Sequence, residues 1–232
     1  MIDECVSFLL QMYCVAVFIH FTTLIKARCD TINIKKICFL LFTHHYLCLK
    51  SIANMKLINE RLLSQVAFIH EIDKLKYIQR KTKLFNSERQ ENDAEHSWHL
   101  AMMTIVLAEH SNEKVDVMKV LKMVLIHDIV EIDAGDIFLY DNKLNHTNTE
   151  AERLAAERIF GLLPKDQAEE FISIWEEFEA GVTEEAKFAR SMDRLEPLLQ
   201  NVSNNGGTWR EYNVEYSRVY KTQEVIRHGS QT

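Results

Sequence analysis

The chain reads Met123-Val124-Leu125-Ile126-His127-Asp128-Ile129-Val130-Glu131 at the point that decides its fold. Here an imidazole and a carboxylate lie next to each other inside an apolar run. Burying either group is costly unless a partner compensates, and a bound metal ion is the strongest such partner. Two more candidate ligands, His96 and Asp193, lie 31 residues before His127 and 65 residues after Asp128. Together the two imidazoles and two carboxylates indicate a metal-dependent hydrolase.

The spacing within this segment separates ligands from a catalyst. On an α-helix, His127 and Asp128 point about 100° apart, so both reach one ion only if it lies over the groove between them. Glu131 follows Asp128 by three positions and therefore lies on the same face, one turn along. From there it can serve a metal-bound water without touching the metal. His96 and Asp193 must then come from neighbouring helices, as the core of a helical bundle allows.

Helical periodicity dominates the chain from residue 55 onward. Only 2 Pro and 6 Gly are present, which favours long helices over a turn-rich β-fold. Residues 81–91 lack a period and are expected to form a loop, and no stretch alternates long enough to predict a strand. The fold class is therefore all-α, a helical bundle. The expected helices are one ending near Arg80, then 92–109, 116–134 and 149–160, one starting at Pro164, one capped by Thr183, and 208–226.

Apolar spacing also predicts which helix faces are buried. In the helix that ends near Arg80, the inward stripe includes Leu62, Val66 and Ile69. In the helix over 92–109, the inward residues include Trp98, Met102 and Ile105. Both stripes are expected to pack against the core.

Residues 1–54 differ in composition from the rest of the chain. They contain no Gly, Pro or Trp and carry five basic against three acidic residues, whereas residues 55–232 carry 22 basic against 31 acidic. All five cysteines lie before residue 50, with a spacing that matches neither a zinc site nor a disulfide framework. We therefore divide the chain into an apolar, cysteine-containing extension (1–54) and a globular domain (55–232).

Three interpretations of the extension remain open. Residues 5–25 carry no charge over 21 positions, which is about the length that spans a bilayer. Basic residues follow, which would place the later domain in the cytoplasm. In the second interpretation, the extension is a buried helical addition to the domain. In the third, the protein normally starts at Met55, where the composition becomes that of a regular amphipathic helix.

Charge and cysteine usage limit the partners. The net charge of −7 provides no positive field that would attract nucleic acid. The lack of cysteine after residue 50 is typical of an intracellular enzyme. We expect a cytoplasmic protein that acts on a small molecule and has no nucleic-acid partner. A membrane is a partner only if residues 5–25 form an anchor, in which case the domain faces the cytoplasm.

Five segments carry a resemblance to a known family. They are residues 75–80, 95–97, 127–131, 135–137 and 186–193. In this order they resemble the HD-domain superfamily of metal-dependent phosphohydrolases, whose signature is His…His-Asp…Asp on an all-α core. The resemblance is closer to the branch of single-domain 5′-deoxynucleotidases, and it covers about residues 57–225.

The resemblance implies a metal site. One divalent ion, Mn²⁺, Co²⁺, Zn²⁺ or Fe²⁺, would be bound by His96, His127, Asp128 and Asp193. Dinuclear members of the superfamily need further histidines between the His-Asp pair and the last Asp. This chain has only His146 there, which favours a single ion.

The resemblance also implies roles around the metal. Glu131 would be the general acid/base beside the metal-bound water, and Arg80 would orient the substrate phosphate in catalysis. Asp136 would bind the sugar. Lys81 occupies a position where the nucleotidases often have an aromatic residue, so it adds a phosphate contact and removes a surface on which a base could stack.

We therefore expect an enzyme that removes phosphate from (deoxy)nucleoside 5′-monophosphates through a metal-activated water. The resemblance also implies a homodimer. Other reactions of the same fold stay open, namely nucleotide triphosphohydrolysis, guanosine tetraphosphate hydrolysis and di-iron oxygenation. A last alternative is a non-catalytic, membrane-tethered binding module with a degenerate metal site.

Overall fold

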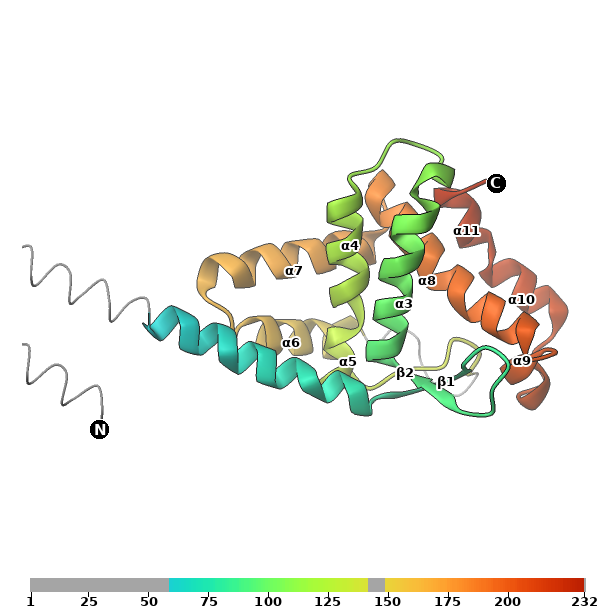
Figure 1. The fold of residues 1–232 in the computed structure, drawn as a ribbon, viewed down its shortest axis with the longest axis horizontal. Helices are drawn as coiled ribbons and strands as arrows, with labels where there is room; N and C mark the ends of the chain where they lie inside the picture. Colours follow the sequence, from blue (N-terminus) through green and yellow to red (C-terminus); the bar gives the residue numbers. More distant parts are fainter. Residues whose placement is uncertain (1–58, 142–148, 232) are drawn as a thin grey trace, which may run out of the picture. The chain divides into compact units, whose positions relative to one another are not determined.

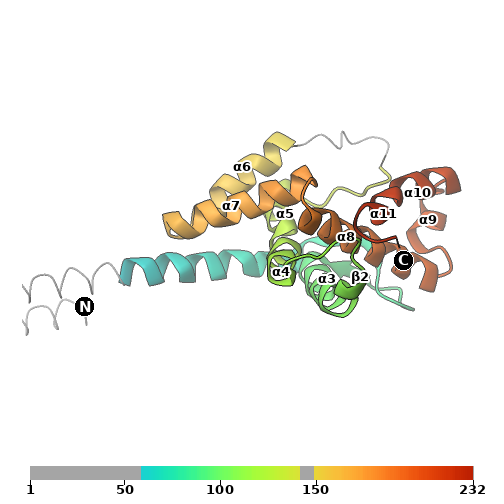
Figure 2. The same cartoon turned by 90° about the horizontal axis from the view of Figure 1, so that it is seen from above.

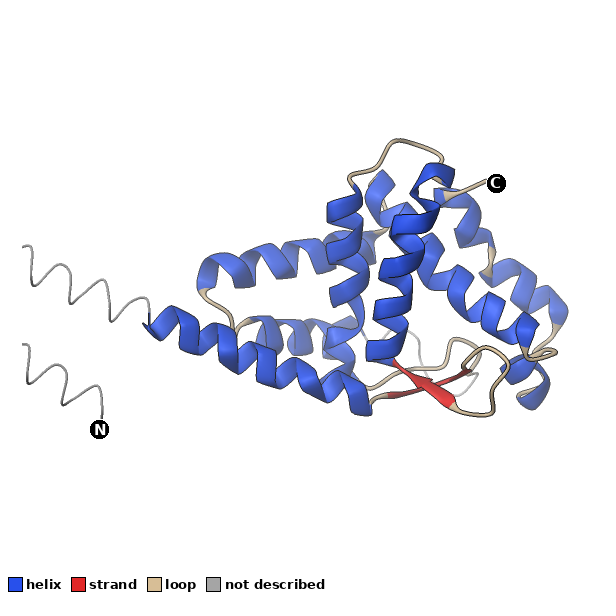
Figure 3. Ribbon diagram, viewed as in Figure 1, coloured by secondary structure: helices blue, strands red, loops and turns tan. Residues whose placement is uncertain are grey.

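The computed structural model describes residues 59–141 and 149–231 (Figure 1), which are predominantly helical (Figure 3). The all-α class is confirmed. The described part begins with a helix over residues 59–72. The elements that follow, with η for a 3-10 helix, are η1 (Asp73–Tyr77), β1 (Gln79–Lys83), β2 (Gln90–Asn92), α3 (Asp93–Leu107), η2 (Ala108–His110), α4 (Val117–Ile126), η3 (His127–Val130), α5 (Glu131–Ala134), α6 (Thr149–Phe160), α7 (Lys165–Ala180), α8 (Glu184–Ser203), α9 (Gly207–Glu211), α10 (Tyr216–Thr222) and α11 (Glu224–Gly229).

Helix α8 lies at the centre of the domain and packs against α3, α4, α7 and α11 (Figures 1 and 2). Phe188 and Met192 of α8 are fully buried, as are Leu100 of α3 and Val124 of α4. All four belong to one hydrophobic core. This packing brings α3, the end of α4 and α8 together, although they lie far apart in the sequence.

The three helices that meet at this point, α3, α4 and α8, each begin with a side-chain cap. Asn92 and Glu95 form a reciprocal capping box at the start of α3. Asp116 caps α4 and Thr183 caps α8. Each cap satisfies backbone N–H groups that the first turn of a helix leaves without partners. The caps at Asn92, Asp116 and Thr183 agree with the predicted helix starts.

Helices α6, α7 and α8 lie where the sequence predicted them. The predicted helix over 116–134 is a continuous helical segment made of α4, η3 and α5, and it ends at Gly135 with φ of 77°. The prediction for the C-terminal region is wrong in one respect: the single helix expected over 208–226 is divided into α9, α10 and α11.

The segment before α3 differs from the prediction in its strands. The helix expected to end near Arg80 ends in η1 at Tyr77, and Arg80 itself lies on β1. The expected loop over residues 81–91 contains most of an antiparallel hairpin of β1 and β2. Strand β1 has the sequence Gln-Arg-Lys-Thr-Lys, so no alternation of apolar residues could reveal it. The hairpin directs the Arg80 side chain toward the core.

The two predicted inward stripes are wrong for the residues named above, because these lie at the surface. The exposed residues are Leu62, Val66, Ile69, Trp98, Met102 and Ile105. The buried face of α3 instead carries His96, Leu100 and Met103. Polar site residues therefore determine which side of α3 faces inward.

Some predictions fall outside the described residues. They include the extension (1–54), the domain boundary at residue 55, the anchor over 5–25 and His146. In the part of the chain that the structure describes, no helix has both the length and the apolar character needed to cross a bilayer.

Candidate active site

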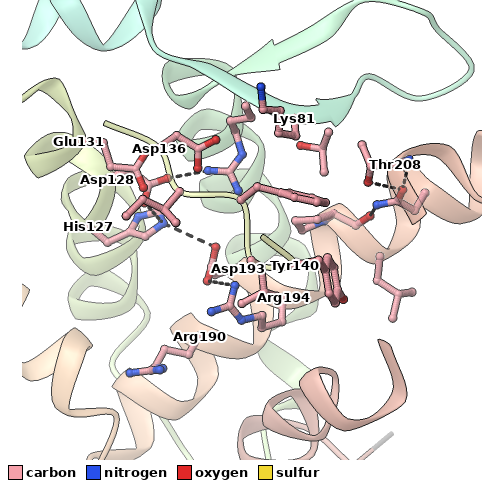
Figure 4. Close-up of a pocket in the computed structure, with 18 of the residues that line it drawn as sticks. Lys81, His127, Asp128, Glu131, Asp136, Tyr140, Arg190, Asp193, Arg194 and Thr208 are labelled. Atoms are coloured by element: carbon pink, nitrogen blue, oxygen red, sulfur yellow. Dashed lines mark hydrogen bonds and ion pairs between the residues drawn. The ribbon is translucent and has the colours of Figure 1, made fainter. Parts of the chain in front are cut away.

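The four predicted ligands meet where α3, η3 and α8 converge, and Figure 4 shows His127, Asp128 and Asp193 of this group. Asp193 Oδ1 lies 3.2 Å from His96 Nε2 and 3.7 Å from His127 Nε2. Asp128 contributes its two oxygens, with Oδ1 3.0 Å from His127 Nε2 and Oδ2 3.9 Å from His96 Nε2. One ring nitrogen from each histidine and oxygens from both aspartates thus face one small volume.

The donor atoms of this cluster fit a divalent metal ion. His127 Nδ1 donates a hydrogen bond to the Val124 carbonyl at 3.1 Å, which leaves Nε2 as the free, metal-binding nitrogen. That Nε2 is buried and faces the two predicted carboxylate ligands, 3.0 Å from Asp128 Oδ1 and 3.7 Å from Asp193 Oδ1. Single donor atoms of His96, His127 and Asp193 lie within 4.8 Å of one another. Two imidazoles with carboxylates suit divalent transition metals.

The backbone around the His-Asp pair is tighter than predicted. Residues His127–Val130 form a 3-10 helix rather than an α-helix, and in this geometry side chains three residues apart eclipse each other. Glu131 therefore lies beside Asp128. One carboxylate oxygen from each of Glu131, Asp128 and Asp93 lies within 4.8 Å of the other two. This placement agrees with the predicted position of Glu131 next to the ligands.

Mutual attraction sets the charges of the predicted ligands. Burial lowers the pKa of His127, but the carboxylates of Asp128 and Asp193 outweigh it and raise the pKa to about 9. Burial would raise the pKa of Asp128, but His127 outweighs it and lowers the pKa to about 2. Arg194 and the two histidines likewise hold the pKa of Asp193 well below its usual value despite burial. The metal-free cluster is thus a network of protonated histidines and ionised aspartates.

A second group of buried residues contacts His96 at Nδ1, the ring nitrogen that does not face the other predicted ligands. His96 Nδ1 donates to Glu196 Oε2 at 3.3 Å and lies 3.6 Å from Glu91 Oε2. Gln200 donates to Glu91 Oε1 at 2.8 Å and also to Glu196. A carboxylate that accepts from the far nitrogen of a ligating histidine fixes the ring and its tautomer. We did not predict these residues, although Glu196 follows Asp193 by three positions and so shares its helix face.

Arg80 is more constrained than the sequence suggested. Its Nη1 donates to Asp128 Oδ2 at 3.1 Å and lies 3.5 Å from Asp93 Oδ1, while its Nε lies 3.7 Å from Glu91 Oε2. Burial lowers the pKa of Arg80, but Asp128 and other nearby carboxylates outweigh it and raise the pKa. The structure therefore places Arg80 next to the predicted ligands, in contact with three carboxylates.

Glu131 lies in an environment that favours its protonated form. Burial raises its pKa well above the usual value, and the charges of Asp128, Asp93 and Asp136 add to the effect. Burial and Asp128 raise the pKa of neighbouring Asp93 to about 7. A protonated Glu131 can donate a proton to a leaving oxygen, as a general acid must. The sequence did not single out Asp93, because a carboxylate at the start of a helix is ordinarily a solvated first-turn charge.

A cavity of about 250 Å³ opens beside the cluster. Its lining includes the predicted Arg80, Lys81, Glu131 and Asp136. Burial raises the pKa of Asp136, whereas Lys81 is exposed. The structure therefore brings the predicted site residues to the lining of one cavity, with the Lys81 side chain at its edge (Figure 4), except for His96, which is fully buried behind the lining.

Comparisons with known proteins agree with this geometry. The family model described as HD domain matches residues 72–232. The chain is 26% identical to the mouse (Mus musculus) 5′-deoxynucleotidase HDDC2, over 69% of this chain and 82% of the relative. It is 30% identical to the human (Homo sapiens) HDDC2, over 59% of this chain and 66% of the relative. A solved structure, that of a predicted metal-dependent phosphohydrolase from Magnetospirillum magnetotacticum MS-1, is 51% identical, with a TM-score of 0.71 over 74% of this chain and 86% of its own.

An all-α core with His…His-Asp…Asp at its centre defines a metal-dependent phosphohydrolase. The chain belongs to the HD-domain family. Divalent-metal binding follows from that membership and from the donor set described above.

Proposed function

We propose that this protein is a 5′-nucleotidase that releases inorganic phosphate from nucleoside 5′-monophosphates, with deoxynucleotides as the preferred class. The observation that carries the proposal is the convergence of His96, His127, Asp128 and Asp193 beside a cavity that also holds Glu131 and Arg80. The relatives named 5′-deoxynucleotidase support the substrate class. The cavity size fits a small molecule.

We assign one divalent ion to the four ligands, with His96 and His127 binding through Nε2. When bound, such an ion lowers the pKa of its water and supplies hydroxide to attack phosphorus. Arg80 orients the phosphate from the β1 side of the cavity. Glu131 donates a proton to the leaving 5′-oxygen, and Asp136 hydrogen-bonds the sugar. Phe138 and Trp209 also line the cavity and provide apolar surface for the base.

A metal-supplemented phosphatase screen of the full chain tests this function. Ribo- and deoxynucleoside monophosphates are incubated with Mn²⁺ or Co²⁺, and phosphate and pyrophosphate are measured separately. We expect phosphate from monophosphates and none from the metal-stripped protein. Pyrophosphate released from triphosphates, or no phosphate from any monophosphate, would contradict the proposal.

Two variants separate binding from catalysis. His127→Ala should lose metal and activity together, because it removes a ligand nitrogen. Glu131→Ala should keep its metal content but lose turnover by about 100-fold or more, because the proton donor is absent. Metal content is measured by elemental analysis alongside kcat. Wild-type turnover in Glu131→Ala would remove its assigned role.

We also propose that the protein is a cytoplasmic homodimer. Trp98, Met102 and Ile105 form an exposed apolar stripe on α3, and α3 and α6 lie on opposite sides of the domain (Figure 2). Their spacing of four and then three residues is that of a helix–helix contact. In sedimentation experiments, the wild type should be a dimer and the double variant Trp98→Lys with Ile105→Glu a monomer. A monomeric wild type would contradict the assignment.

A further inference from the structure

Arg194 of α8 occupies a position in the site that neither the sequence pattern nor the assigned roles use. It follows Asp193 directly and lines the same cavity as Glu131 and Asp136. Its Nη1 lies 3.6 Å from Asp193 Oδ2, and its side chain is 28% exposed. Asp193 Oδ1 faces the two histidines. The Arg194 guanidinium therefore lies across the Asp193 carboxylate from the candidate metal position (Figure 4).

Of the other cations of the cavity, Lys81 lies exposed at the edge, and the two arginines are less available than Arg194. Arg80 contacts Asp128, Asp93 and Glu91, so three carboxylates already offset its single charge. Arg190, one helical turn before Arg194, donates to the carbonyls of Phe178 and Glu179 at 3.4 and 2.6 Å. Figure 4 shows the Arg190 guanidinium directed away from Asp193. Arg190 is thus committed to protein groups, and Arg80 orients the phosphate with a charge that protein carboxylates already offset.

Arg194 keeps most of its binding capacity. A guanidinium has five N–H donors in a planar fork, and among the described residues its one ion pair is the 3.6 Å contact with Asp193. The fork matches two phosphate oxygens, which makes an arginine–phosphate pair stronger than a single neutral hydrogen bond. An incoming dianion beside Asp128, Asp193 and Asp136 needs a cation that is not already neutralised.

We propose that Arg194 is a phosphate-binding residue. It contacts the substrate phosphoryl group from α8, while Arg80 contacts it from β1 on the other side. This inference rests on the proposed function, because it assigns a residue to the phosphomonoester of that reaction. Two guanidiniums then flank the phosphoryl group, with Arg80 held against Asp128 and Arg194 against Asp193.

The test compares Arg194→Gln, Arg194→Lys and Arg190→Gln in the full chain at saturating Mn²⁺. Deoxyadenosine 5′-monophosphate is the substrate probe, inorganic phosphate the inhibitor, and deoxyadenosine a control that lacks phosphate. We expect Arg194→Gln to raise KM and the phosphate inhibition constant by about 10- to 100-fold, the size of a lost charge-assisted pair. Inhibition by deoxyadenosine should not change. Arg194→Lys should recover part of the loss, because it keeps the charge but not the fork.

Arg190→Gln is the matched control, because it removes a guanidinium from the same helix and cavity. It should lower the melting temperature through its lost carbonyl contacts while leaving the phosphate inhibition constant close to that of the wild type. The inference is overturned if Arg194→Gln retains the wild-type inhibition constant, if its KM returns to normal once Mn²⁺ is raised, or if Arg190→Gln shows the larger phosphate effect.

Calorimetry with inorganic phosphate on the Mn²⁺-loaded protein keeps this test separate from the proposed function. If the wild type binds phosphate and Arg194→Gln does not, the inference stands even when no nucleotide is hydrolysed. If the wild type hydrolyses nucleotides and Arg194→Gln binds phosphate equally well, the function stands and the inference fails. A Mn²⁺-loaded wild type that binds no phosphate also overturns the inference.

Discussion

Metal affinity should depend steeply on pH, because the ion must displace protons that the metal-free protein holds. Asp128 and Asp193 raise the pKa of buried His127 to about 9. Burial and Arg80 lower the pKa of His96, but Asp193 and Glu196 outweigh them and raise it well above its usual value. Since a metal binds only the neutral imidazole, each histidine must lose a proton on binding.

The magnitude follows from the pKa of His127. At pH 7, two units below a pKa of about 9, His127 is neutral in only about 1% of the molecules. This weakens metal binding by about 100-fold, or roughly 2.7 kcal/mol. Because a proton leaves as the ion enters, affinity rises as pH rises and levels off above the pKa of the metal-free protein. His96 also loses a proton when the metal binds, so it makes the metal affinity rise more steeply with pH.

The assay is calorimetric titration of the metal-stripped full chain with Mn²⁺ between about pH 6.5 and 8.5, in two buffers of different ionisation enthalpy. We expect one to two protons released per ion and an affinity that rises by about tenfold or more per pH unit. An affinity that is constant across this range, with no proton release, would refute the account of the charged cluster.

Two further predictions concern the support of the site and the core. Glu196→Ala should weaken Mn²⁺ binding by about 10- to 100-fold, because His96 Nδ1 loses its buried acceptor. Glu196→Gln keeps an acceptor oxygen and should weaken binding less. Equal Mn²⁺ affinity in the wild type and both variants would show that Glu196 does not position the His96 ring. Phe188→Ala should lower the free energy of unfolding in urea by about 3–5 kcal/mol, because Phe188 is fully buried. The exposed Leu154→Ala is its control and should change that free energy by no more than about 0.5 kcal/mol; similar values for the two variants would contradict the assigned core.

Helix positions could be predicted where local signals agree with the packing. Asp116, Thr183 and Gly135 mark helix ends by capping and backbone preference, and these depend on a few neighbouring residues. Strand β1 could not be predicted, because its residues are polar and its stability comes from pairing with β2 and from burial of Thr82 and Glu91. Long-range contacts of this kind leave no local pattern.

The buried face of α3 was mispredicted for a physical reason that also explains the site. Periodicity assigns apolar residues to the interior, so Trp98 and Met102 were expected inside. The structure instead buries Asp93 and His96, which are stabilised by partners from β1 and α8. A helix face that carries ligands breaks the apolar rule, because compensating charges from other elements replace apolar contacts.

The same reason limited prediction of the site. His127, Asp128 and Glu131 could be singled out because they interrupt an apolar run. Glu91 lies in a polar stretch of the sequence and Glu196 lies between Leu195 and Pro197, and only the fold shows that both carboxylates are buried behind His96. Residues that support a ligand through space are therefore identified by the structure rather than by spacing.

Anomalous diffraction from crystals of the full chain grown with Mn²⁺ tests the central claim most directly. We predict one anomalous peak within about 2.0–2.3 Å of His96 Nε2, His127 Nε2 and an oxygen of both Asp128 and Asp193. The Glu91–His96–Glu196 group also places three donor atoms within 4.8 Å of one another. A peak in that group, or no peak at the predicted ligands, would contradict the assignment of the metal centre.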